Sequence, residues 1–134
     1  MRILNEQEET LVLNDISARL IHGVKIANVD IMTEEVQGAY EVISVNKNRK
    51  TVAFDTPDCL IHCYRNMEMV KPYLRPMSSM TDEEQYICRI KRGEDLAGGV
   101  GNESDYLNSI HVDYRGLIEK GLAIEVTEEN NPYK

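Results

Sequence analysis

The residues best suited to chemistry in this sequence are two cysteines and a histidine, Cys59, His62 and Cys63. Cysteine and histidine are the usual ligands of structural zinc. Three further residues are of the right type for a fourth ligand: Cys88, His111 and His22. The run is expected to be a strand, in which Cys59 and Cys63 face one side and His62 the other, so the three cannot converge on one ion. We therefore predict free, mostly buried thiols, a surface histidine and no metal.

Other catalytic patterns are also missing from the chain. A cysteine nucleophile needs a base beside an exposed thiol. Because neighbouring residues of a strand face opposite sides, His62 cannot act as a base for Cys63. The glycine-rich run LAGGVG (96–101) lacks the lysine and Ser/Thr of a phosphate-binding P-loop. Acidic pairs such as Glu34/Glu35 have no identifiable partner base. We expect neither a catalytic set nor a cofactor, and a protein that is not an enzyme.

Tyrosine and arginine are the residue types that sequence alone marks for recognition, because both are enriched in binding hot spots. Five of them are candidate binding residues: Tyr73, Arg75, Tyr106, Tyr114 and Arg115. The structural alternative is that Tyr73 and Leu74 close the open end of a β-barrel. A second alternative is a pocket for a small signalling nucleotide near Tyr73, Arg75 and Arg115.

The net charge of −8 is unevenly distributed. Residues 1–80 hold 11 acidic and 9 basic side chains, for −2, whereas residues 81–134 hold 12 and 6, for −6. An acidic surface repels phosphate backbones, which disfavours nucleic acid as a partner. A basic spot at Lys47, Arg49 and Lys50 keeps a nucleic-acid module as a further alternative.

No apolar run approaches the roughly 20 residues of a membrane helix, and the first residues lack the layout of a signal peptide. We therefore expect a cytoplasmic protein that does not bind membranes.

The first half of the chain has the pattern of short strands. A short helix is expected over 13–20, followed by a strand near 24–32. Residues 38–54 predict a β-hairpin whose tip, NKNRK, is basic. A further strand is expected over 59–64, and the chain before Pro72 must be extended. The fold class predicted is α+β, with a small SH3-like β-barrel or a bent antiparallel sheet in the N-terminal half.

The second half has the pattern of helices. Thr81 and Glu84 form a capping box that begins a helix, and Gly93 is placed to end it. Ser104 or Asp105 can cap another helix, and Asp113 a third over 114–120. A last strand is expected over 122–126. We thus predict a β-rich subdomain over 1–80 and a helical C-terminal half over 81–134, the two packed as one compact domain in the alternative arrangement.

Two runs resemble the hallmarks of a known family: VKPYLRPMSSMTDEE (70–84) and DYLNSIHVDYRGLIEKGLAIE (105–125). The family comprises small proteins encoded by phages, prophages and mobile elements of gut Bacteroidales. The runs cover 36 of the 134 residues. LNDISARLIHGVKI also resembles the family's opening, where Cys is more usual than Ser17, and the ending VTEENNPYK departs from the family's short tail.

The resemblance implies a genomic setting rather than a mechanism, since the family brings no established activity and no catalytic or ligand residues. Small acidic phage proteins often act by binding. The expected function is therefore that of a non-enzymatic phage or prophage protein that contacts a host protein and inhibits a defence system, as an anti-CRISPR protein does. A signalling-nucleotide sponge and a nucleic-acid accessory module are the alternatives.

Overall fold

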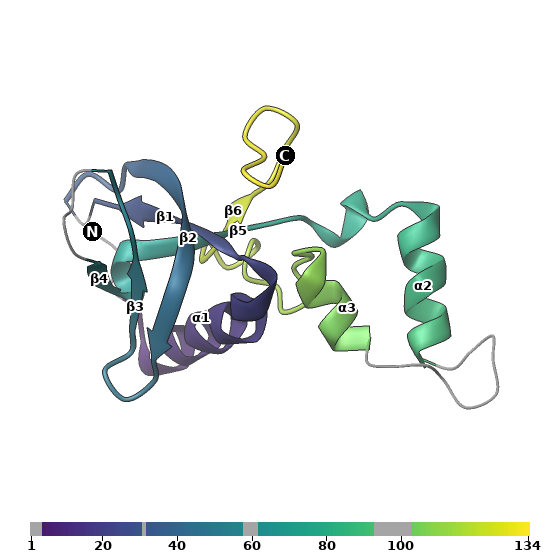
Figure 1. Cartoon of the computed structure of the whole chain (residues 1–134), viewed down its shortest axis with the longest axis horizontal. Coiled ribbons are helices and arrows are strands. Elements are labelled where there is room, and N and C mark those ends of the chain that lie inside the picture. Colours follow the sequence, from purple (N-terminus) through teal and green to yellow (C-terminus); the bar gives the residue numbers. More distant parts are fainter. Residues whose placement is uncertain (1–3, 31, 58–61, 93–102) are drawn as a thin grey trace.

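The computed structural model describes residues 4–30, 32–57, 62–92 and 103–134. Within these ranges the chain forms a six-stranded mixed sheet and three α-helices, which places it in the α+β class (Figure 1). In sheet order the strands are β4 (Cys63–Asn66), β3 (Thr51–Phe54), β2 (Val36–Asn46), β1 (Lys25–Val29), β5 (Val70–Leu74) and β6 (Ile124–Glu125). The helices are α1 (Glu6–Arg19), α2 (Asp82–Arg92) and α3 (Glu103–Ser109), with short 3₁₀ turns η1 (Leu20–His22), η2 (Met67–Met69) and η3 (Met77–Ser79).

The sheet is open, so the closure expected of an SH3-like barrel is not found in the part of the chain that the structure describes. β4 and β6 lie at opposite edges, and β6 pairs with β5 in parallel whereas the other pairings are antiparallel. The register shifts in the β1–β2 pairing, between Ile26 and Asn28, and in the β2–β3 pairing, between Val42 and Ser44. Such irregularities bend a strand locally. The bent-sheet alternative therefore describes strands β1 to β5 better.

The hairpin predicted over 38–54 is confirmed. β2 and β3 pair antiparallel, and the pair Asn46–Thr51 closes the connection. The residue with left-handed backbone in this connection is Lys50 (φ 54°). The extended backbone expected before Pro72 is likewise found, as strand β5. Of the strand expected over 59–64, residues 58–61 lie outside the described ranges and β4 begins at Cys63.

The first helix is longer than predicted and begins earlier. α1 begins after Asn5, whose side chain accepts from the Glu8 amide while the Glu8 carboxylate accepts from the Asn5 amide. This capping box places the acidic residues that precede the expected helix, Glu6, Glu8 and Glu9, in the first turn of α1, where carboxylates are favourable to the helix dipole. The buried face of α1 carries Val12 and Ile16, which pack against the sheet.

One main core joins both parts of the chain. Leu74 is fully buried in it, together with Ile26 and Phe54 from the sheet. Leu117 and Leu122, from the C-terminal segment, belong to the same cluster. A second, smaller cluster lies between α2 and α3: Met80, Cys88, Leu107 and Val112.

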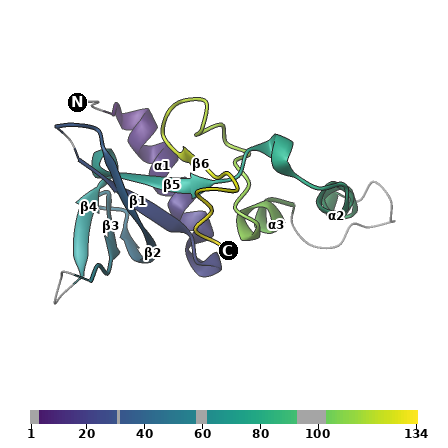
Figure 2. The same ribbon diagram turned by 90° about the horizontal axis from the view of Figure 1, so that it is seen from above.

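The segment 81–134 is only partly helical. The predicted capping box of α2 is confirmed, since Glu84 N donates to Thr81 Oγ1 at 3.1 Å and Thr81 N to Glu84 Oε1 at 2.9 Å. Residues 114–120 form turns instead of the expected helix, although Asp113 still accepts from the amides of Leu117 and Ile118. The expected helix end at Gly93 and the run LAGGVG lie outside the described residues. Both views show α2 projecting from the sheet, with α3 between them; we call η3 and these two helices the arm (Figures 1 and 2).

Candidate functional site

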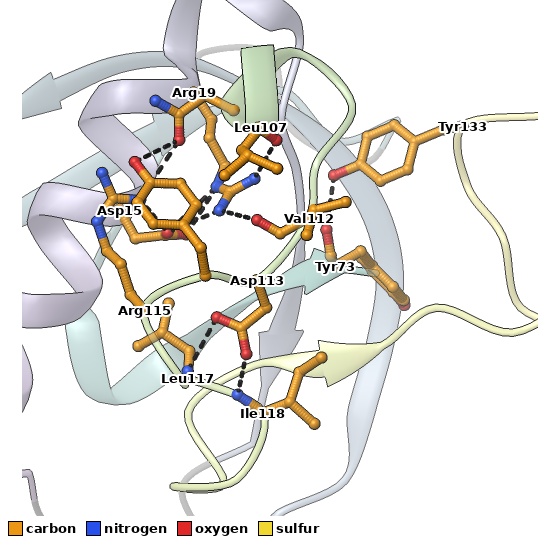
Figure 3. Close-up of polar contacts among 12 residues, drawn as sticks. Asp15, Arg19, Tyr73, Leu107, Val112, Asp113, Arg115, Leu117, Ile118 and Tyr133 are labelled. Carbon is orange, nitrogen blue, oxygen red and sulfur yellow. Dashed lines mark hydrogen bonds and ion pairs between the residues drawn. The ribbon is translucent and has the colours of Figure 1, made fainter. Parts of the chain in front are cut away.

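A buried guanidinium links α1 to the C-terminal segment. Arg19 and Asp15 are both 0% exposed, and Arg19 Nε lies 3.1 Å from each Asp15 carboxylate oxygen (Figure 3). The same guanidinium donates to the carbonyl oxygens of Leu107 at 3.4 Å and Val112 at 2.6 Å. The carbonyl of Leu107 lies in the last turns of α3, where a cation is favourable. Sequence reasoning missed this pair, although its i,i+4 spacing beside Val12 and Ile16 places it on the buried face of α1.

Two of the predicted binding residues complete this buried network. Arg115 Nη1 donates to Asp15 Oδ1 at 2.6 Å, and its guanidinium lies 4.3 Å from the ring centroid of Tyr114. The Tyr114 hydroxyl donates to Asn108 at 3.2 Å. Arg19 lies on the same ring, at 5.7 Å. The DYRG run of the sequence is thus a junction between α1 and α3, and its arginine and tyrosine are engaged inside the molecule.

α3 ends in a left-handed residue that is not glycine. His111 has φ 60°, its amide donates to Asn108 O, and the Val112 amide donates to Leu107 O. These two bonds define a Schellman motif, and the packing of Val112 on Leu107 supplies its hydrophobic contact. Burial, reinforced by the positive charge of Arg19, lowers the pKa of His111 to about 4, so its imidazole is neutral at pH 7.

Tyr133, close to the end of the chain, packs against His111. The rings are stacked, with centroids 3.9 Å apart and planes within 8°. Its hydroxyl donates to Tyr73 O at 2.8 Å and accepts from Lys25 N at 3.0 Å, and burial raises the pKa of Tyr133 to about 12. Tyr73 itself donates to Gly38 O at 2.8 Å. Its neighbour Leu74 lies in the main core, and both residues belong to strand β5, so this run is part of the open sheet rather than the closure of a barrel.

Arg75 fixes the root of the arm. It forms a bidentate pair with Glu84, at 2.8 Å and 2.7 Å, and also donates to the hydroxyl and carbonyl of Ser79. Hydrogen bonds from Arg75 lower the pKa of Glu84 to about 2. Glu84 also accepts from the Thr81 amide, so Arg75, which directly follows β5, is joined both to Ser79 of η3 and to the start of α2. The run LRPMSSMTDEE is therefore a rigid elbow.

A groove lies on the arm between η3, α2 and α3. It has a volume of about 210 Å³ and is lined by Met77, Met80, Gln85, Cys88, Arg89, Glu103 and Leu107. Met77 is 51% exposed at its mouth. Just outside, Tyr86 is 48% exposed and its ring lies 5.7 Å from the Arg89 guanidinium. Tyr106, another of the predicted binding residues, is half-buried and packs against the apolar cluster that includes Met80, Cys88 and Leu107.

The three basic side chains of the hairpin tip do not all lie in the same place. Lys47 and Arg49 line a second groove, of about 420 Å³, on the outer face of β2, β3 and β4. Lys50 instead lies 3.8 Å from Glu9 of α1. Tyr64, which also lines this groove, is 61% exposed.

A third cavity, of about 380 Å³, lies between α1, β1 and β5. Its floor is apolar, and among the described residues that line it the carboxylates of Asp30, Glu34 and Glu68 outnumber the ammonium of Lys71. This balance of charge would repel a nucleotide phosphate. The residues expected to form a nucleotide pocket, Tyr73, Arg75 and Arg115, are instead distributed among the contacts described above.

The cysteine cluster does not form a metal site in the described residues. Cys63 and Cys88 are buried, and His62 is an exposed residue whose Nδ1 lies 2.5 Å from Asp55. No group of three His, Cys, Asp or Glu side chains within residues 4–30, 32–57, 62–92 and 103–134 is placed to hold an ion. Cys59 lies outside these ranges. None of the helices described is long and apolar enough to cross a membrane.

No protein-family model, curated protein or solved structure matches this chain. The five tyrosines and arginines predicted to bind do not form one surface: Tyr114 and Arg115 serve the buried junction, Arg75 the elbow, and Tyr73 the contact with Tyr133. Sequence reasoning did not single out Met77, Arg89 and Tyr86, the side chains displayed on the arm.

Proposed function

We propose that this chain is a non-enzymatic binding protein of phage or prophage origin whose arm contacts a host protein and so inhibits a host defence system. The observation that carries the proposal is the groove of about 210 Å³ on the arm, with Met77 at its mouth and Tyr86 and Arg89 beside it. Methionine, tyrosine and arginine are enriched at protein interfaces relative to other surface. The host cytoplasm is the proposed place of action.

The partner proposed is an amphipathic helix. The groove floor, formed by Met80, Cys88 and Leu107, offers apolar contact to one or two anchor side chains, while Gln85 and Arg89 supply polar groups at the rim. Helix-in-groove recognition uses this combination, and flexible methionines adapt to the shape of the anchor. Because Arg75 and Glu84 hold the elbow, the groove is preorganised and less conformational entropy is lost on binding.

The proposal is tested by photocrosslinking in a Bacteroidales host. A photoreactive amino acid at position 77 should capture a specific host protein, whereas the same group at Ile21, which is 86% exposed and lies outside the arm, should not. With the photoreactive group kept at position 77, replacing two exposed side chains of the same surface, Tyr86→Ala with Arg89→Glu, should abolish capture and leave the melting temperature unchanged. Capture of the same proteins from both positions, or capture that survives the double substitution, would refute the arm as the binding site.

A further inference from the structure

The outer face of the hairpin has an ordered arrangement of side chains that the arm does not explain. Strand register aligns Ser44 with Ala53 and Ala53 with Tyr64 in one row across three strands. The next row toward the tip begins with Asn46 and Thr51. Alternate residues along a strand share a face and lie about 7 Å apart, so both rows belong to the same surface.

The first row is suited to stacking. Tyr64 is 61% exposed, whereas its cross-strand neighbour Ala53 is only 2% exposed. Ser44 and Ala53 are small, so the surface beside the tyrosine ring is hollow, as the groove there shows. An aromatic ring displayed on a sheet face is a platform on which an unpaired base stacks, irrespective of its identity.

Two positively charged side chains lie at the hairpin tip, beside the second row. Lys47 and Arg49 line the same groove, both side chains are exposed, and no carboxylate is among the described residues that line it. This local charge is opposite to the net charge of −8. Lys50 is excluded from the groove, because it lies across the hairpin near Glu9.

We infer that this groove binds single-stranded nucleic acid over about two or three nucleotides. One base stacks on Tyr64, Lys47 and Arg49 contact two phosphates, and the polar side chains of Ser44, Asn46 and Thr51 lie between them within reach of base edges or sugar hydroxyls. An acidic peptide would use the two cations but would leave the exposed ring and its hollow without a partner. A duplex is disfavoured, because its bases are stacked within the helix and its backbone needs a wider array of cations.

The experiment is fluorescence anisotropy of a labelled single-stranded RNA and DNA of mixed sequence, titrated with the full chain at several salt concentrations. Neutralising two phosphates predicts a log–log salt slope of about −1.4, since each contributes about −0.7 on a single strand. Affinity should then fall about sevenfold between 50 mM and 200 mM salt. Tyr64→Ala should weaken binding about 5-fold to 150-fold at one salt concentration, and Tyr64→Phe should retain it.

Charge variants give a matched control on one hairpin. Lys47→Gln should reduce the salt slope to about −0.7, while Lys50→Gln removes the same charge outside the groove and should leave affinity and slope unchanged. The three substituted side chains, Tyr64, Lys47 and Lys50, are exposed or half-buried, so thermal unfolding should confirm that each of the four variants is folded. The inference is overturned by absence of binding at 50 mM salt, by equal effects of the two lysine variants, or by an acidic phosphopeptide that competes fully while Tyr64→Ala has no effect.

Discussion

Substitution of Arg19 by methionine tests the buried junction most directly. Arg19→Met keeps the length and much of the volume of the side chain but removes the charge that faces Asp15. Both carbonyls that lose the guanidinium keep a backbone donor, since Val112 N bonds Leu107 O and Tyr114 N bonds Val112 O. The main consequence is therefore at Asp15, a fully buried carboxylate left with Arg115 alone.

The expected loss follows from that geometry. Removing one partner of a buried ion pair costs about 3–5 kcal/mol of unfolding free energy, and the remaining bond from Arg115 places this case at about 3 kcal/mol. The double variant Asp15→Leu with Arg19→Met removes the stranded carboxylate and fills the site with apolar atoms. It should recover more than half of the loss, because Arg115 is partly exposed (20%) and can reach water.

Urea denaturation followed by circular dichroism measures both effects. With a slope of about 2 kcal/mol per molar urea, the single variant should lower the midpoint by about 1.5 M at an unchanged slope. Arg115→Met is the matched control and should cost less, because it removes one bond from a partly exposed group. A loss below about 1 kcal/mol for Arg19→Met, or a double variant less stable than the single one, would contradict the reasoning.

Two further predictions concern acid stability and the core. Because the pKa of His111 falls from 6.5 to about 4 on folding, its contribution to stability is complete above about pH 6.5 and is lost as the pH falls toward 4. Between pH 7 and pH 4 the free energy of unfolding of the wild type should fall by about 3 kcal/mol more than that of His111→Asn, as measured by urea denaturation at each pH. Asparagine is the control substitution because it tolerates the left-handed backbone. Equal losses in the two proteins would contradict this prediction. Leu74→Ala, at a fully buried core position, should cost about 2–5 kcal/mol, and a variant as stable as wild type would show that Leu74 does not support the core.

Elements whose signals are local could be predicted from the sequence. The hairpin and the start of α2 depend on residues only a few positions apart, such as Thr81 and Glu84, and both were predicted correctly. The beginning of α1 had an equally local signal in Asn5 and Glu8, which we did not use. The prediction of a helix over 114–120 was wrong because packing in the core determines the backbone there. The chain folds into turns that place Leu117 and Leu122 in the core, and Asp113 caps those turns.

The sequence by itself determined the α+β class, the capping of α2, the basic tip of the hairpin and the chemical types available for binding. Only the tertiary structure decided which tyrosines and arginines are exposed at the surface and which are engaged in contacts within the molecule. Arg19 donates to the carbonyl oxygen of Val112, 93 residues away in the sequence, and Arg115 donates to Asp15, 100 residues away. No local pattern encodes such partners, because they meet only when burial of the shared core brings α1 against the end of α3. The same packing leaves Met77, Tyr86 and Tyr64 at the surface, where binding is proposed.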